Sequence, residues 1–125
     1  MQLIVDMIVP ANIEDIEYFL LAFQRKRTER GMVYLSRDKN FQAMLDLEIS
    51  AVQRDRVIDS LRLKHYYKGP HEDGVRPGSE YWEFGAKVKG KEVYIKLAIG
   101  LEDGPVLCFS FHAAERKITY PYRNH

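Results

Sequence analysis

The hydrophobic pattern changes its period about halfway along the chain. In the first half, apolar side chains recur every three to four positions, the spacing of one face of an α-helix. From residue 81 onward, apolar and polar side chains alternate, the spacing of a β-strand with one buried face. The pattern predicts a mainly helical part at 1–61, a loop at 62–80, and an antiparallel sheet with a tail at 81–125.

Three helices are expected in the first part. Asn12 is a suitable N-cap for the first helix, and Gly31 is a suitable end for it. Ser36 is expected to cap a second helix, and the capping-box pattern at Ser50 begins a third that runs to about residue 61. The side chains expected on the buried faces are Ile13, Ile16, Leu20, Phe23, Phe41, Met44, Leu45, Val52, Val57, Ile58 and Leu61.

Three strands are expected in the second part. Gly90 and the segment 102–105 provide short turns between them, which favours an antiparallel meander. The strands cover 81–89, 92–100 and 106–112, and shorter extended pieces lie at 3–9 and 32–35. The strand side chains expected to face the helices are Trp82, Phe84, Ala86, Val88, Val93, Ile95, Leu97, Ile99, Leu107, Phe109 and Phe111. The fold expected is α+β, one domain over 1–125, with N-terminal helices packed on one face of a C-terminal antiparallel sheet.

The opposite face of this sheet carries several ionisable groups. Its expected residues are Glu83, Lys87, Tyr94, Lys96, Ser110 and His112. An antiparallel sheet commonly leaves one face in water, so polar residues alone would need no explanation. This face, however, combines a carboxylate, an imidazole, a phenol and two amines, and has few of the Thr, Gln or Asn residues of a passive surface.

This combination fits metal-free cleavage of RNA. The reaction needs a base for the 2′-hydroxyl proton, an acid for the leaving 5′-oxygen, and cations for the charge on the phosphorane. Glu83 or Tyr94 fits the base and His112 the acid, or the roles are reversed. The side chains expected to hold phosphate are Lys68, Lys87 and Lys96, and those expected to stack on unpaired bases are Tyr66, Tyr67, Tyr81 and Tyr94.

Composition narrows the classes of protein. The chain has 125 residues, and its 19 Lys and Arg nearly balance 18 Asp and Glu, which excludes a polycation that binds DNA by bulk charge. The sequence contains no run of about 18 apolar residues, so no membrane-spanning segment is predicted. The single cysteine, Cys108, allows neither an intramolecular disulfide nor a cysteine-based zinc site, and a reducing cytoplasm is expected. All four histidines and six of the eight tyrosines lie in 62–125, which favours a site in that half.

Two further segments contain candidate functional residues. His65 and His71 flank a predicted loop with nearby acidic residues, but their spacing matches no metal-binding motif, and a solvated loop is favoured. No metal and no cofactor is therefore expected. The segment 119–123, with two tyrosines around a proline, is expected to pack on the domain as an ordered tail. The alternative is that this segment extends to the site.

Several segments together resemble one known family. The stretches SLRLKHYYKG, YWEFG, EVYIKL and VLCFSFH, followed by AERKITYPYR, resemble the motility quorum-sensing regulator toxins of bacterial toxin–antitoxin pairs, over about residues 40–123. The resemblance implies a RelE-like α+β fold and metal-independent cleavage of messenger RNA. It also implies a cognate antitoxin, typically a zinc-containing, DNA-binding protein, and leaves open whether the ribosome takes part.

The resemblance also implies four site residues. The family's functional lysine falls on Lys68, the functional residue after the tryptophan on Glu83, the tyrosine on Tyr94, and the residue after the last Ser-Phe on His112. The best-known member has Gln and Lys where this chain has Glu83 and His112. Both replacements here are better proton-transfer groups. The chain also has a longer loop before the tryptophan and an added tail.

Two other readings compete with the endoribonuclease toxin. The same face would serve a non-catalytic module that binds RNA or the ribosome without proton transfer. It would also serve a regulatory domain that binds a protein. Loss of toxicity on changing Lys68 and Lys96, but not Glu83 and His112, would favour the RNA-binding module.

Overall fold

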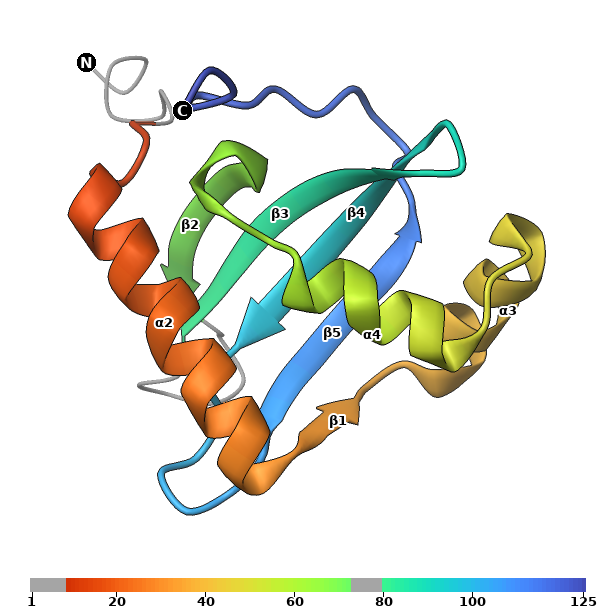
Figure 1. Ribbon diagram of the computed structural model, residues 1–125, viewed down its shortest axis with the longest axis horizontal. Helices are drawn as coiled ribbons and strands as arrows, with labels where there is room; N and C mark the ends of the chain where they lie inside the picture. The colour runs from red at the N-terminus through yellow and green to blue at the C-terminus, as the bar shows by residue number, and fades with distance from the viewer. Residues whose placement is uncertain (1–8, 73–79) are drawn as a thin grey trace.

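The computed structural model describes residues 9–72 and 80–125, which form a mixed sheet with helices on one face (Figure 1). In these residues the strands lie in the order β1-β5-β4-β3-β2. The elements in chain order are α2 (Ile13–Arg30), β1 (Met32–Tyr34), α3 (Arg37–Leu47), α4 (Ala51–Asp59), the 3₁₀ turn η1 (Leu63–His65), β2 (Tyr66–Glu72), β3 (Glu80–Val88), β4 (Lys91–Ala98) and β5 (Val106–Ala113). The α+β class is confirmed. The extended piece expected at 3–9 lies almost wholly outside the described residues.

Two of the three predicted helix starts are confirmed atom by atom. The backbone N–H of Asp15 donates to the Asn12 side chain over 2.8 Å, and Gly31 ends α2 with a φ of 82°. Ser50 and Gln53 form the full capping box, each side chain bonding the other residue's backbone N–H. Ser36 precedes α3 but does not cap it, because its backbone is left-handed and its side chain makes no cap bond.

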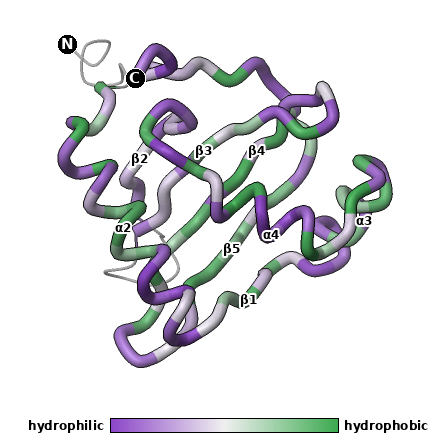
Figure 2. The backbone as a smooth tube through the Cα atoms, in the orientation of Figure 1, coloured by the Kyte–Doolittle hydropathy of each residue, from purple (hydrophilic) through white to green (hydrophobic). Residues whose placement is uncertain are grey.

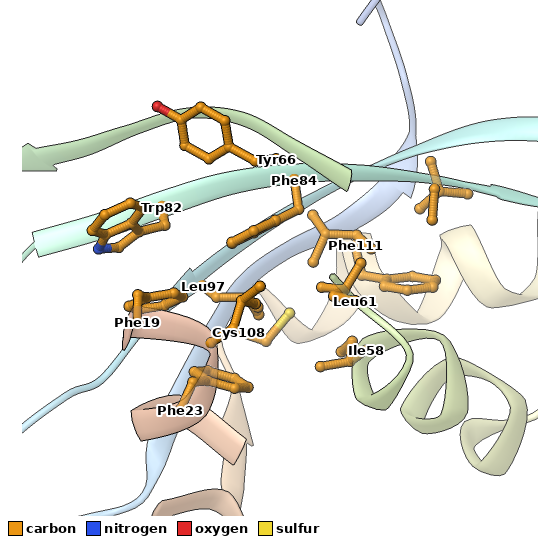
Figure 3. Close-up of a cluster of buried hydrophobic side chains, with 14 of the residues drawn as sticks. Phe19, Phe23, Ile58, Leu61, Tyr66, Trp82, Phe84, Leu97, Cys108 and Phe111 are labelled. Carbon is orange, nitrogen blue, oxygen red and sulfur yellow. The ribbon is translucent and has the colours of Figure 1, made fainter. Parts of the chain in front are cut away.

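The core lies between the helices and one face of the sheet. Figure 3 shows the side chains of α2 and of the α4 region facing Trp82, Phe84 and Leu97 from the sheet. In Figure 2 the hydrophobic stretches of β4 and β5 run beneath the helices. In the described part of the chain, no helix has the length and apolar character needed to cross a bilayer. The buried face predicted for β3 and β4 is confirmed from Trp82 to Val88 and from Val93 to Leu97.

The predicted inner faces of α3 and α4 are partly wrong. Phe41, Leu45 and Val52 are 59%, 56% and 60% exposed. The residues that α3 buries are instead Asn40, Ala43 and Leu47. The reason is that α3 contacts the rim of the sheet at β5 through a polar residue, so its larger apolar side chains point away from the core.

Asn40 is a buried polar residue that joins three elements. Its amide nitrogen donates to the carbonyl of Leu35 over 2.6 Å, and its amide oxygen accepts from the backbone N–H of Phe111 over 3.1 Å. The parallel pairing of β1 with β5 ends at Tyr34 and Cys108, so Asn40 supplies the next bond along that edge of β5.

Asn40→Ala is expected to lower the free energy of unfolding by about 1–3 kcal/mol, because buried backbone groups of Leu35 and Phe111 would lose their partners. Urea denaturation measures this change. The control is Gln42→Ala on the same helix, where the side chain is exposed and bonds only Asp46. An equal effect in the two variants would contradict the role of Asn40.

The segment predicted as a loop at 62–80 contains a strand. Residues 66–72 form β2, which pairs antiparallel with β3 through two irregularities of register. Gly69, with a φ of 121°, and Pro70 break the regular pattern, and this is why the sequence suggested a loop. Tyr66 is fully buried and not a base-stacking residue: its hydroxyl accepts from Ala11 N–H and donates to the Gly69 carbonyl.

The sheet is mixed rather than purely antiparallel. The short strand β1 pairs parallel with β5, from Met32 opposite Val106 to Tyr34 opposite Cys108. The pairs β3 with β4 and β4 with β5 are antiparallel as expected, and β2, which was not expected, also pairs antiparallel with β3. Helix α2 ends beside the start of β5, where the Val106 N–H donates to the Gly31 carbonyl, and β1 then runs in the same direction as β5 (Figure 1).

A β-bulge in β5 reverses the predicted faces of its first half. Lys96 of β4 lies opposite Ser110, whereas the next residue, Leu97, lies opposite Cys108, so Phe109 is the extra residue of the bulge. Cys108 is therefore fully buried, and burial raises the pKa of its thiol to about 12. The predicted inward positions of Leu107 and Phe109 are wrong, whereas that of Phe111 is confirmed.

Candidate active site

The face of the sheet opposite the helices presents its polar residues in cross-strand rows. In the central row, Lys68 of β2, Glu83 of β3 and Lys96 of β4 are register partners, and Ser110 of β5 follows. In the next row, Gly85 of β3, Tyr94 of β4 and His112 of β5 are partners. The four residues singled out by the sequence, Lys68, Glu83, Tyr94 and His112, line one pocket of about 290 Å³.

Glu83 is the centre of the hydrogen bonding in this pocket. Its Oε1 accepts a bond from the Tyr94 hydroxyl over 2.5 Å, and its Oε2 lies 2.9 Å from Nε2 of His71. The Glu83 side chain is only 14% exposed. Because a carboxylate oxygen accepts, Nε2 of His71 carries the hydrogen of that bond. Both oxygens of Glu83 are thus oriented by neighbours from two other strands.

Tyr94 is held in its protonated form. Burial and its hydrogen bond to Glu83 both raise the pKa of the Tyr94 phenol above its ordinary value of about 10. A phenol that donates to a carboxylate at neutral pH cannot accept a proton as a base. Of the two candidates for the base, this favours Glu83 and leaves Tyr94 to orient it.

Because the pKa of Tyr94 is raised in the folded state, the free energy of unfolding is expected to fall as pH rises into the alkaline range. The folded state keeps the proton when the unfolded phenol loses it, so this contribution is complete below pH 10 and is lost as pH rises further. Urea denaturation between pH 8 and 10.5 is expected to show a smaller loss of stability in Tyr94→Phe than in the parent. The pKa values of Tyr34 and Tyr120 are also raised, so part of the loss persists. An identical loss in parent and Tyr94→Phe would contradict the prediction.

His112 lies beside Tyr94, with 5.4 Å between the two ring centres. Its Nδ1 is 2.9 Å from the carbonyl oxygen of Ala113, which can only accept a hydrogen bond. Nδ1 therefore carries the hydrogen, and Nε2 is left to gain or lose a proton. The side chain is partly exposed, as an exchanging group in an open pocket needs to be.

Two cationic side chains, those of Lys68 and Arg116, line the same pocket as the Glu83 carboxylate. The Nζ of Lys68 lies 4.7 Å from the ring centre of Tyr67, and both residues line the pocket. Arg116, which follows β5 in the chain, lines it as well and was not predicted. The sequence signal for Arg116 was weak, because a basic residue in a tail is usually solvated.

The chain after β5 returns over this face and forms one wall of the pocket. Glu92 of β4 accepts from the backbone N–H of Ile118 over 3.2 Å and from the Tyr120 hydroxyl over 2.9 Å. Ile118 is buried, and Tyr122 donates to the carbonyl of Ala11. The expectation that 119–123 packs on the domain is confirmed, and the wall itself is formed by residues 114–118.

Gly85 makes this packing possible. A Cβ at position 85 would lie 2.5 Å from the Tyr120 hydroxyl and 2.7 Å from Cδ1 of Ile118. Gly85→Ala is expected to weaken the docking of the tail by about 1–3 kcal/mol, because the tail has to move away from the strand. Amide hydrogen exchange at Ile118 measures the change. Gly104→Ala is the control, since a Cβ there meets nothing closer than 3.8 Å. Unchanged exchange in Gly85→Ala would refute this account.

The predicted binding residues are only partly brought together. Tyr67 lines the pocket, whereas Lys96 and Tyr81 lie beside it on the same face, with Nζ of Lys96 4.2 Å from the Tyr81 ring centre. Lys87 is exposed and does not line the pocket; its register partner is Glu92, to which the tail is bound. The structure thus gives no support to Lys87 as a phosphate-binding residue.

The sequence favours a solvated loop for His71, but the structure places this residue beside the candidate site. Strand β2 brings it opposite Tyr81 and into contact with Glu83. His65, the other histidine of that stretch, accepts from the backbone N–H of Arg62, and burial lowers its pKa. Among residues 9–72 and 80–125, no cluster of three metal-ligating side chains is present.

A larger cleft is chemically poorer. It measures about 520 Å³ and lies between α2 and the strands, against Phe19 and Trp82. The described residues that line it include two carboxylates, Asp15 and Glu80, but no Lys, Arg or His. Of the two, the smaller pocket therefore has the richer set of proton-transfer and cationic side chains.

Comparisons with known proteins identify no relative. Neither a family model, nor a curated protein, nor a solved structure matches this chain.

Proposed function

We propose that this protein is a metal-independent endoribonuclease that acts as the toxin of a bacterial toxin–antitoxin pair and cleaves messenger RNA. The observation that carries the proposal is the Glu83 carboxylate, held by Tyr94 and His71 in the same pocket as the His112 imidazole. Two proton-transfer groups of different kind, with lysine beside them, are what phosphodiester transfer to a 2′-hydroxyl needs. A RelE-like fold is part of the proposal, since helices cover one face of the sheet and the other face bears the site.

In the proposed reaction, Glu83 takes the proton of the 2′-hydroxyl as its oxygen attacks phosphorus. The bond from phosphorus to the 5′-oxygen breaks, and His112 gives its Nε2 proton to that oxygen. The products are a 2′,3′-cyclic phosphate and a 5′-hydroxyl. Lys68 and Arg116 stabilise the charge on the phosphorane, and Tyr94 keeps the carboxylate oriented.

The test is incubation of the purified chain with a long mixed-sequence RNA in EDTA. Cleavage to 2′,3′-cyclic phosphate and 5′-hydroxyl ends is expected, and the all-deoxy strand of the same sequence should stay intact because it lacks the nucleophile. Cleavage that EDTA abolishes would overturn the metal-independent mechanism. Absence of cleavage both on free RNA and on translating ribosomes would overturn the nuclease.

The proposed partner is a cognate antitoxin, which the family resemblance supports. Coexpression with the protein encoded by the neighbouring gene is expected to relieve toxicity. A neighbouring protein with paired Cys-x-x-Cys motifs would fit the zinc-containing antitoxins of the resembling family. Lack of any rescue by either neighbour would count against this part of the proposal.

A further inference from the structure

Next to the pocket, four side chains from four strands form a cluster on the polar face of the sheet. They are His71 of β2, Tyr81 of β3, Lys96 of β4 and Phe109 of β5. The ring centres of His71 and Tyr81 are 5.0 Å apart, and those of Tyr81 and Phe109 are 6.4 Å apart at an interplanar angle of 68°. Nζ of Lys96 lies 4.2 Å from the Tyr81 ring centre and 5.6 Å from that of Phe109.

The β-bulge is what brings Phe109 into this cluster. In a regular strand, residues 108 and 112 would lie on the same face, because successive side chains alternate. Here Cys108 faces the core and His112 faces the pocket, so the strand changes face at the bulge between them. The extra residue at the bulge turns the Phe109 ring toward Tyr81 and Lys96, where both rings are partly exposed. The cluster therefore offers two aromatic rings and a positive charge together on a partly exposed face.

We propose that Tyr81 and Phe109 form a stacking subsite for an unpaired base of single-stranded RNA, and that Lys96 binds the phosphate of that nucleotide. Aromatic rings beside a cation are the usual means by which proteins hold single strands. Lys96 is the register partner of Glu83, so the subsite lies one strand away from the carboxylate proposed as the general base. The bound base would belong to a nucleotide adjacent to the scissile phosphate. The inference rests on the proposed function for its substrate, but not on the chemistry of cleavage.

The test measures binding without cleavage. The probe is a short, fluorescently labelled, single-stranded RNA with 2′-O-methyl groups at every position, which lacks the attacking hydroxyl. Fluorescence anisotropy gives the dissociation constant. Phe109→Ala is expected to weaken binding about tenfold, the size of one lost base-stacking contact, and Phe109→Trp to restore it. The matched control is Phe41→Ala, which removes the same ring from an exposed position of helix α3 and is expected to bind as the parent does.

Two further arms separate stacking from charge. Lys96→Gln is expected to reduce the slope of log K against log salt by about 0.7, the value for one phosphate contact on a single strand. The fully paired duplex of the same probe is expected to bind more weakly, because its bases are not available to the rings. Tyr81→Leu provides a second stacking variant if Phe109→Ala fails to fold.

The outcomes distinguish this inference from the proposed enzyme. Binding that depends on Phe109 in a protein that cuts no RNA would keep the subsite and reject the nuclease. If the parent cleaves RNA, and Phe109→Ala and Tyr81→Leu bind the probe as tightly as the parent does, the subsite is rejected and the nuclease is kept. A parent that binds no probe at all would overturn the subsite as well.

Discussion

His112→Ala is expected to lower the rate of RNA cleavage by about 10²- to 10⁴-fold, the usual contribution of one positioned acid or base. The imidazole is the proposed donor to the leaving 5′-oxygen, and its Nδ1 is already engaged with the Ala113 carbonyl. The variant should keep its fold, because His112 is partly exposed and the surrounding strand pairing is made by backbone.

The measurement is the initial rate on a mixed-sequence RNA in EDTA, with the unfolding transition recorded for each variant. His125→Ala is the matched control, since His125 is an exposed histidine that does not line the pocket. Cleavage by His112→Ala at the parental rate would exclude His112 as the acid. A slow variant that a leaving group of low pKa restores would identify His112 as the acid specifically.

Glu83→Gln is expected to lower cleavage by a similar factor, about 10²- to 10⁴-fold, because an amide cannot take the 2′-hydroxyl proton. The substitution preserves side-chain volume and one oxygen that can still accept from Tyr94. RNA binding is expected to remain, so the loss should appear in kcat rather than in KM.

Glu80→Gln makes the same chemical change at an exposed position of β3 and serves as the control. Parental activity in Glu83→Gln would exclude the carboxylate as base. Toxicity that survives both Glu83→Gln and His112→Ala, but is lost on replacing Lys68 and Lys96, would instead favour a module that binds RNA without cutting it.

Strand alternation predicted the buried and polar faces of β3 and β4, because both strands are regular over their length. It could not predict β5 in full. The sequence from Val106 to His112 is compatible with either set of alternating side chains facing the core. Only the pairing with β4 fixes the bulge at Phe109. The strand β2 was missed for a related reason: Gly69 and Pro70 are turn residues in isolation, yet pairing with β3 keeps them in a strand.

The candidate site shows the same division. Glu83, Tyr94 and His112 follow from alternation alone, since adjacent strands of a meander bring them together. His71 and Arg116 depend on the irregular pairing of β2 and on the return of the chain after β5, which no local pattern encodes. Asn40 was missed because it follows three charged residues, and a polar residue in such a stretch is normally assigned to the solvent side of a helix.

The parallel pairing of β1 with β5 has a consequence for the order of folding. In the β3–β4–β5 meander, paired strands are joined by short turns. Strand β1, by contrast, pairs with a strand that is more than half the chain away in sequence, and closing that long loop is slower. We therefore expect the amides of β4 to become protected first in pulse-labelled hydrogen exchange, and the Phe111 amide bound by Asn40 later. Simultaneous protection of both would contradict this order. On this pathway the polar face with Glu83, Tyr94 and His112 is assembled before the helices have sealed the core behind it.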